Sequence, residues 1–235
     1  MLRTQIVSDD HGGNNIKLPT LRSSASNFVA VDIGFANSYN NPGGANKNPI
    51  MPAVAAMIEG DSSAFYRCGF FGVQDTLWDA AGRHYYRDCT IMGAVDFIFG
   101  DGQTIFQGCA LTVADMPAGI VGYLTAHGRP SSEARSGFVF DGCQVTGRSP
   151  TYLGRAWGAF ARVVFYRTTF NVPVANPRWS PWHYPENRDE MVFVTVQCEG
   201  LGAEPGQKTL SPEVVTQYAS MDFIEAGQWL NSQPK

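Results

Sequence analysis

Charged side chains are scarce in this sequence. Asp, Glu, Lys and Arg make up 16% of the 235 residues, whereas about 25% is usual for globular proteins. Helical bundles and coiled coils need many Glu, Lys and Arg residues on their exposed faces, so the sequence disfavours both. The net charge of −4 and the absence of a Lys/Arg cluster argue against nucleic acid as a partner.

Long apolar segments are also missing. The longest nearly unbroken apolar run covers residues 51–58 and contains Pro52, whereas a helix needs about 20 apolar residues to cross a bilayer. We therefore expect no transmembrane helix and no membrane partner. The first residues, MLRTQIVSDDHGG, do not resemble a signal peptide, because no apolar stretch follows a positively charged start.

Glycine is abundant, and the cysteines mark a repeat. The 25 glycines exceed the norm of about 7%, which fits many buried strands joined by tight turns. Cys68, Cys89, Cys109 and Cys143 lie in AFYRCGF, YYRDCTI, IFQGCAL and VFDGCQV, and a fifth copy, VFYRTTF, carries Thr168 instead. An apolar residue follows two places later in every copy, and the copies are 21, 20, 34 and 25 residues apart. Strand-like units repeated in this way predict a solenoid, here an all-β parallel β-helix.

The repeat also indicates what the five cysteines do. Their odd number leaves at least one unpaired, and we expect them to stack inside the coil as small apolar side chains rather than to form disulfides. A leucine-rich repeat is the competing solenoid, but its L-x-x-L-x-L pattern is missing. We expect residues 110–138 to include a loop at one corner, and SPEVVTQYASMDFIEAGQWL to form a short helix or a cap that closes the end of the solenoid.

Two aspartates share one position of the repeat. Asp75 follows Cys68 by seven residues, and Asp96 follows Cys89 by seven, so stacked coils would place them about 4.8 Å apart. Two charges ~5 Å apart at an effective dielectric constant of ~20 repel by about 3 kcal/mol, or roughly two pKa units. One carboxyl group would then ionise while its neighbour keeps a proton, which suits a nucleophile or base beside a general acid. The alternative is a pair of solvated turn residues.

Other side chains could complete such a site. Gln74 could donate a hydrogen bond to developing negative charge, and Arg155 could hold one carboxylate ionised. Nothing in the spacing alone places Arg155 there, and taken alone it fits a surface arginine better. The four histidines, at positions 11, 84, 127 and 183, lack metal-ligand spacing. Aromatic residues that could line a sugar-binding cleft, or pack in the core instead, are Trp78, Phe99, Trp157 and Trp179.

These segments resemble the plant pectin methylesterases (pectinesterases). GVQDTLWDAAGRHYYRDCTIMGAVDFIFG is similar to the family's GYQDTLY and YRDC..G.VDFIFG blocks, and LGRAW is similar to LGRPW. Weaker similarity covers DIGFANSYN, TAHGR and the stretch through GQWL, so the resemblance spans nearly the whole chain. It implies a right-handed parallel β-helix, one catalytic domain over residues 1–235, and hydrolysis of polygalacturonate methyl esters to methanol and pectate.

The resemblance also implies roles for single residues. Asp96 matches the family's nucleophile, Asp75 its general acid and later base, and Gln74 an oxyanion-hole donor. Arg155 matches the residue that orients the nucleophile and contacts substrate together with Trp157. Further groove aromatics by this comparison are Trp78, Phe99 and, more weakly matched, Trp179.

The resemblance implies no metal and no organic cofactor. The expected partners are pectin (homogalacturonan) and a proteinaceous inhibitor, and the expected form is a monomer secreted to the cell wall. A polysaccharide lyase on the same kind of solenoid would need clustered acidic calcium ligands, which the sequence lacks beyond the aspartate pair.

The chain departs from the family pattern in two places. The family carries QAVAL before its G-D-x-S-x-F-Y segment, and this glutamine is a second oxyanion donor. Counting back from Asp61 without gaps places Pro52 there, and proline offers neither an N–H nor a polar side chain. We hypothesise a weak or inactive esterase unless another amide, such as Asn48, replaces it. Family domains also begin with additional coils, so we expect an N-terminally truncated domain, and a pectin-binding or regulatory protein without efficient catalysis is the alternative function.

Overall fold

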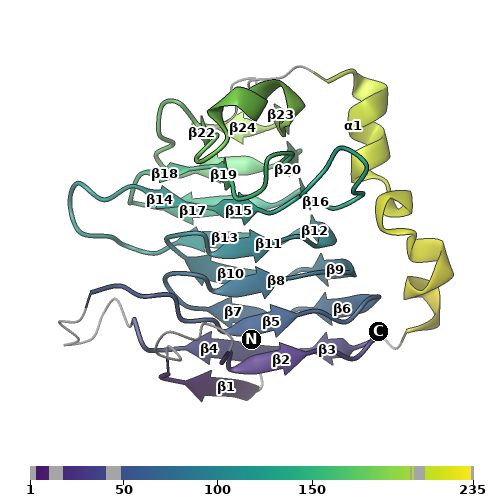
Figure 1. Cartoon of the computed structure of the whole chain (residues 1–235). Helices are drawn as coiled ribbons and strands as arrows, with labels where there is room; N and C mark the ends of the chain where they lie inside the picture. The colour runs from purple at the N-terminus through teal and green to yellow at the C-terminus, as the bar shows by residue number, and fades with distance from the viewer. Residues whose placement is uncertain (1–3, 11–17, 41–48, 202, 204–209, 234–235) are drawn as a thin grey trace.

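The computed structural model describes residues 4–10, 18–40, 49–201, 203 and 210–233. The chain winds into a stack of coils, and each full coil contributes one strand to each of three parallel sheets (Figure 1). This architecture is the predicted parallel β-helix. No helix in these ranges is both long enough and apolar enough to span a bilayer.

The three sheets run along the whole stack. Sheet A contains β1 (Thr4–Ser8), β4 (Ile33–Asn37), β7 (Gly69–Phe71), β10 (Thr90–Gly93), β13 (Ala110–Val113), β17 (Gln144–Gly147), β21 (Thr169–Asn171) and β24 (Glu199–Gly200). Sheet B contains β2 (Leu21–Ser23), β5 (Ala56–Ile58), β8 (Leu77–Asp79), β11 (Ile98–Gly100), β15 (Thr125–His127), β19 (Gly154–Ala156) and β22 (Trp179–Ser180). Sheet C contains β3 (Val29–Val31), β6 (Ser63–Tyr66), β9 (Arg83–Arg87), β12 (Gln103–Gln107), β16 (Gly137–Asp141), β20 (Arg162–Tyr166) and β23 (Val192–Val196).

The cysteine repeat marks the turn from sheet C to sheet A. All five thiols are free, as predicted. Cys109, for example, donates to the carbonyl of Gln107 in its own coil and to the carbonyl of Tyr86 in the preceding coil. The same two kinds of bond recur at Cys89, Cys143, Thr168 and Cys198. Cys198 is therefore a further copy of the repeat, which the sequence pattern did not include.

Stacked aromatic rings fill the interior between the sheets. The rings of neighbouring members of this column lie 4.5–4.8 Å apart and nearly parallel. Contacts at this spacing follow directly from the distance between strands in a sheet. The column consists of Phe65, Tyr86, Phe106, Phe140 and Phe165.

The C-terminal segment covers the outer face of sheet C. It contains α1 (Pro212–Ala219) and the 3₁₀ turns η2 (Met221–Ile224), η3 (Ala226–Gln228) and η4 (Leu230–Ser232). Its side chains, such as Ile224, pack against outward-facing residues of sheet C, such as Ile105, and the segment runs back along the stack (Figure 1). The predicted short helix is confirmed, but the predicted end cap is wrong, because the apolar outer face of sheet C needs a cover.

The loops leave the coils at more than one corner. Residues 114–121 connect sheet A to sheet B and precede a short parallel pair of strands, β14 (Gly122–Tyr123) and β18 (Thr151–Tyr152). Residues 128–136 connect sheet B to sheet C. The insertion expected at one corner between residues 110 and 138 is therefore divided between two corners. A further 3₁₀ turn, η1 (Pro185–Glu190), precedes β23.

Candidate active site

Asp75 and Asp96 lie in the turns from sheet A to sheet B of two successive coils. Asp75 lies between β7 and β8, and Asp96 lies between β10 and β11. Gln74 pairs with Val95, and the Asp75 N–H donates to the Val95 carbonyl over 3.0 Å. The two aspartates therefore occupy equivalent positions in adjacent coils, as the seven-residue spacing predicts. Both adopt left-handed backbone conformations, with φ of 60° and 47°, which aspartate tolerates better than most residues.

A glycine makes room for the second of these turns. A Cβ atom on Gly93 would lie 2.1 Å from the Cβ atom of Phe97, far inside van der Waals contact. Any other residue at position 93 would therefore displace Phe97, which directly follows Asp96. The close approach keeps the aspartate turn short and fixed.

Arg155 binds both carboxylate oxygens of Asp96 through two hydrogen bonds from its guanidinium group. Its Nε donates to Asp96 Oδ1 over 2.7 Å, and its Nη2 donates to Asp96 Oδ2. Arg155 lies on β19, where it pairs with Ala126, and Ala126 pairs with Phe99 on β11. The guanidinium therefore comes from two coils further along the stack. The sequence suggested this partner, but only the register of the sheets brings it to the carboxylate.

The surroundings of the two carboxyl groups differ strongly. Both are buried, but an arginine contacts only Asp96. Burial, and to a smaller degree the charge of Asp96, raises the pKa of Asp75 to about 7. Burial also raises the pKa of Asp96, while the hydrogen bonds and the charge of Arg155 oppose this rise. The pKa of Asp75 is thus raised mainly by burial rather than by the charge repulsion expected from the sequence.

Two aromatic residues that the sequence did not single out contact Arg155. Its Cζ atom lies 4.4 Å from the ring centroid of Tyr123 and 3.7 Å from that of Trp182. Tyr123 occupies the position of Asp96 in the next coil, since Thr125 pairs with Ile98. Counting from the cysteines misses it, because residues 114–121 interrupt the spacing.

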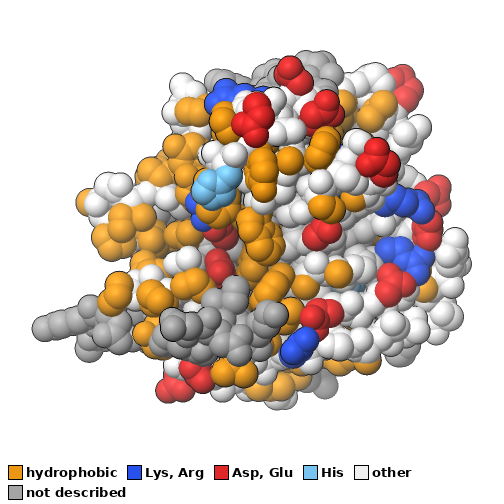
Figure 2. Space-filling view, in the orientation of Figure 1, with side chains coloured by type: hydrophobic (Ala, Val, Ile, Leu, Met, Phe, Trp, Pro, Cys, Tyr) orange, Lys and Arg blue, Asp and Glu red, His pale blue; other side chains and the backbone are white. Residues whose placement is uncertain are grey.

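A groove lined by aromatic side chains lies along sheet B, whose strands β8 and β11 follow the two aspartate turns. The rings of Trp78 and Phe99 stack 5.3 Å apart, and Trp157 lies 5.9 Å from Phe99. Trp157 is 43% exposed, whereas Phe99 is only 4% exposed and contacts the rings of both tryptophans. A cavity of about 430 Å³ extends here between Trp78 and Trp157. On the face shown in Figure 2, acidic side chains lie among apolar ones near the middle of the stack.

Trp179 does not reach this groove. It is 1% exposed, and its ring stacks 4.6 Å from Phe193 inside the solenoid. The expectation that Trp179 lines the groove is therefore wrong, and its alternative as a core residue holds. The strand β22 points this side chain inward, and the residue three places later, Trp182, reaches the surface beside Arg155.

Pro52 lies in the coil before Asp75. The N–H of the next residue, Ala53, donates to the Gln74 carbonyl over 3.1 Å, so position 52 is adjacent to the aspartate turn. The side chain of Asn40 binds the N–H and the carbonyl of Met51, the residue before Pro52. Asn48, the suggested replacement, is outside the described residues.

The described histidines lie outside the aspartate pair. His84 is buried, and its ring nitrogens contact Asp79 Oδ1 at 2.5 Å and the Gly60 carbonyl at 3.0 Å. Burial lowers the pKa of His127 to about 3. His183 stacks on Trp182 at the surface, and position 11 is outside the described ranges. No group of three or more His, Cys, Asp or Glu side chains in those ranges could hold a metal ion.

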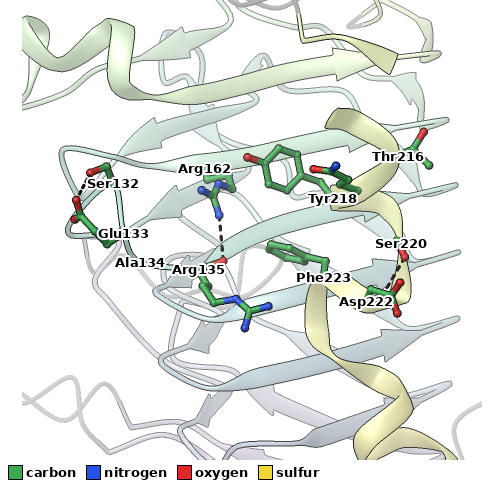
Figure 3. A pocket seen from close by; sticks show the side chains of 11 residues that line it. Ser132, Glu133, Ala134, Arg135, Arg162, Thr216, Tyr218, Ser220, Asp222 and Phe223 are labelled. Carbon is green, nitrogen blue, oxygen red and sulfur yellow. Dashed lines mark hydrogen bonds between the residues drawn. The ribbon is translucent and has the colours of Figure 1, made fainter. Parts of the chain in front are cut away.

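A larger cavity lies away from the aspartates. It measures about 560 Å³ and separates the loop of residues 128–136 from the C-terminal segment. Arg162, Tyr218 and Phe223 are among the residues around it (Figure 3). None of the candidate catalytic or groove residues lines this cavity, so its size does not make it the candidate active site.

Comparison with known proteins agrees with this geometry. A sequence model of the pectinesterase family matches residues 3–227. The chain belongs to the pectinesterase family. Probable pectinesterases 29 and 55 of Arabidopsis thaliana are each 43% identical to it over 240 residues, which cover 98% of this chain and 71% and 72% of theirs.

Solved structures give the same result. The pectin methylesterase from carrot superimposes with a TM-score of 0.86 at 27% identity, over 97% of this chain and 76% of that one. A pectin methylesterase in complex with hexasaccharide VII matches with a TM-score of 0.76 at 26% identity, over 92% of this chain and 74% of that one. These matches establish the right-handed parallel β-helix of this family member.

Proposed function

We propose that this pectinesterase-family chain hydrolyses the methyl esters of pectin, releasing methanol and leaving pectate. The observation that carries this conclusion is the unequal carboxyl pair. Asp96 is bound by Arg155 through two hydrogen bonds, and the equivalent Asp75 is buried with a pKa of about 7. One carboxylate and one carboxylic acid side by side can supply a nucleophile and a proton donor to the same ester.

The first half of the reaction forms an acyl-enzyme. An ionised oxygen of Asp96 attacks the ester carbonyl carbon, and the carbonyl electrons move to its oxygen. Gln74 donates a hydrogen bond to this oxyanion; its side chain makes no hydrogen bond within the described part of the protein. The C–O bond to methoxide then breaks, and Asp75 supplies the proton that completes methanol. The product is an anhydride between Asp96 and the galacturonate carboxyl group.

The second half regenerates the carboxylate of Asp96 and the carboxylic acid of Asp75. Asp75, now ionised, accepts a proton from water, and the resulting hydroxide attacks the acyl carbon of the anhydride. The bond to Asp96 breaks, which restores its carboxylate in contact with Arg155. Arg155 stabilises the ionised form of Asp96 at the start and at the end of the cycle, so the same pairing serves both half-reactions.

The groove beside the pair suits a sugar chain. Trp78 and Trp157 both line the cavity of about 430 Å³, and aromatic rings bind the apolar faces of pyranose rings. Some relatives have been crystallised with hexasaccharides. We therefore propose that homogalacturonan occupies this groove, with Trp157 as the exposed stacking residue.

Several wider features are also proposed from the family. The substrate lies in the plant cell wall, so we propose that the protein acts there after secretion. We further propose that residues 1–235 work as one catalytic domain and as a monomer that a proteinaceous inhibitor can bind at the groove.

Methanol release from highly methylated pectin tests the proposed activity. Asp96→Asn retains the shape of the side chain but removes the nucleophilic charge, so its rate should fall to background while the wild type releases methanol. Asp115→Asn is the matched control, because Asp115 also pairs with an arginine, Arg148, but at an exposed site. Equal release by wild type and Asp96→Asn would refute the assignment of the nucleophile, and no release by either would favour a pectin-binding role.

A further inference from the structure

We propose that Tyr123 and Trp182 form an aromatic clamp that positions Arg155 and, through it, the nucleophilic carboxylate of Asp96. This inference rests on the proposed function, since it assigns the clamp to that site. It makes Trp182 a positioning residue, distinct from the aromatic residues that line the groove.

The contacts around Arg155 leave it little freedom. The Nε and Nη2 atoms bind the two oxygens of Asp96 in the plane of the guanidinium. The Cζ atom lies over the rings of Tyr123 and Trp182, at 4.4 Å and 3.7 Å from their centroids. Rotation of the guanidinium out of its plane would move it into these rings. The in-plane bonds and the rings together therefore fix the plane in which Asp96 is held.

Trp182 is held in place for this contact rather than for core packing. It is 36% exposed, so the interior of the solenoid does not require it. Its φ of 48° is unusual for a bulky residue, and its N–H donates to Ser180 Oγ over 3.2 Å. Such a backbone conformation persists only where neighbouring contacts determine it. His183 stacks on the same ring at 4.5 Å, so among the described residues Arg155 and His183 are its aromatic or cationic contacts.

The clamp also explains how residues from three other coils orient the carboxylate of Asp96. Tyr123 lies on β14, Arg155 on β19 and Trp182 just after β22, so each comes from a different coil. The insertion of residues 114–121 brings Tyr123 to the position equivalent to Asp96, and the loop after β22 brings Trp182 over the arginine. Coils that carry no catalytic aspartate thereby determine the orientation of Asp96.

A split between kcat and KM distinguishes positioning from sugar binding. In Trp182→Ala, the nucleophile is less well oriented, so kcat should fall about tenfold or more while KM changes by less than about threefold. Trp182→Phe keeps a ring face for the guanidinium and should recover most of kcat. Trp157→Ala should show the opposite pattern, with a raised KM, because Trp157 contacts neither Arg155 nor Asp96 in this arrangement. Leu201→Ala, at an exposed site outside the groove, serves as the unchanged control.

An NMR measurement tests the clamp without relying on activity. The Nε–H resonance of Arg155, assigned by its loss in Arg155→Lys, should be shifted by the ring currents and protected from exchange in the wild type. Trp182→Ala should lose both properties, Trp182→Phe should retain much of them, and all variants should melt cooperatively. If the wild type releases no methanol but shows this signature, the proposed function fails and the clamp stands. An unchanged signal in Trp182→Ala, or a rise in KM alone, would overturn the clamp.

Discussion

Two turns of the same solenoid are used in opposite ways. At the turn from sheet C to sheet A, six coils carry a cysteine or a threonine, and the same carbonyl contacts recur from coil to coil. At the turn from sheet A to sheet B, the equivalent positions hold Asp75, Asp96, Tyr123 and Tyr152. The uniform turn keeps the coils in register. The variable turn uses that register to bring together the proposed proton donor, the proposed nucleophile and an aromatic ring.

Asp75→Asn removes the proposed proton donor at the variable turn, and it should lower activity without lowering stability. Asp75→Asn cannot protonate methanol or activate water, so kcat/KM should fall by about 10²–10⁴-fold. The pKa of Asp75 is about 7 in the folded protein, against an ordinary 3.8, so the folded state binds more protons between these values. The free energy of unfolding therefore falls as the pH rises through this range.

The same variant should be more stable than the wild type at pH 8. Asparagine has no charge to bury, so Asp75→Asn should gain up to about 4 kcal/mol in the free energy of unfolding, the value that corresponds to a shift of about three pKa units. Urea unfolding at pH 4 and pH 8 measures this difference, which should be small at pH 4. An equal or lower stability of the variant at pH 8 would contradict the buried, protonated state.

Interrupting the aromatic column should lower the free energy of unfolding of the whole stack of coils. Phe106→Ala leaves a cavity between two rings that lie 4.7 Å from Phe106, and such a change typically costs about 3–5 kcal/mol. Denaturant unfolding should show this loss. Exposed Leu201→Ala is the control, and a loss below about 1 kcal/mol for Phe106→Ala would show that the column does not hold the coils together.

Restoring an amide beside the variable turn should raise activity. Pro52 offers no donor, and one oxyanion donor is typically worth about 10²–10³ in kcat. Pro52→Gln should therefore increase kcat about tenfold or more, whereas Pro52→Ala, which adds only a backbone N–H, should gain less. Methanol release with saturating pectin measures this increase. No gain with glutamine would mean that another group already serves the oxyanion.

The smallest effect is expected at the uniform turn. Thr168 shows that a hydroxyl group can make the contacts of a cysteine at this position, so Cys109→Ser should lower the free energy of unfolding by about 1 kcal/mol or less. Its methanol release should match the wild type. A severe loss of activity with intact stability would show that the two turns are not independent.

The sequence predicted the fold and the aspartate pair because both depend on regular spacing. Cys68, Cys89 and Cys109 follow one another at intervals of 21 and 20 residues. The two aspartates each lie seven residues after a cysteine, so they share the same register. Cys198 escaped the pattern because Gly200, rather than an apolar residue, follows it two places later.

The rest of the site depends on coils where the spacing is irregular. Tyr123 follows an insertion, so counting from Cys109 does not find it, and Trp182 lies on a loop whose path no periodicity describes. Trp179 illustrates the same limit, because its inward direction depends on the pairing of β22 with β19. The contact of Arg155 with Asp96, which makes the two buried aspartates unequal, is likewise a property of the packed coils.

We expect Asp75 and Asp96 to hold different protonation states although they occupy equivalent positions, and a direct titration of their carboxyl groups tests this difference. Carbon-13 NMR of the aspartate carboxyl carbons from pH 3 to pH 9, in the wild type and in Asp75→Asn, gives the required values. We predict one carboxyl group that titrates with a pKa of about 7 and is missing in Asp75→Asn. Titration of both groups below pH 5, or survival of the high-pKa signal in Asp75→Asn, would contradict the account.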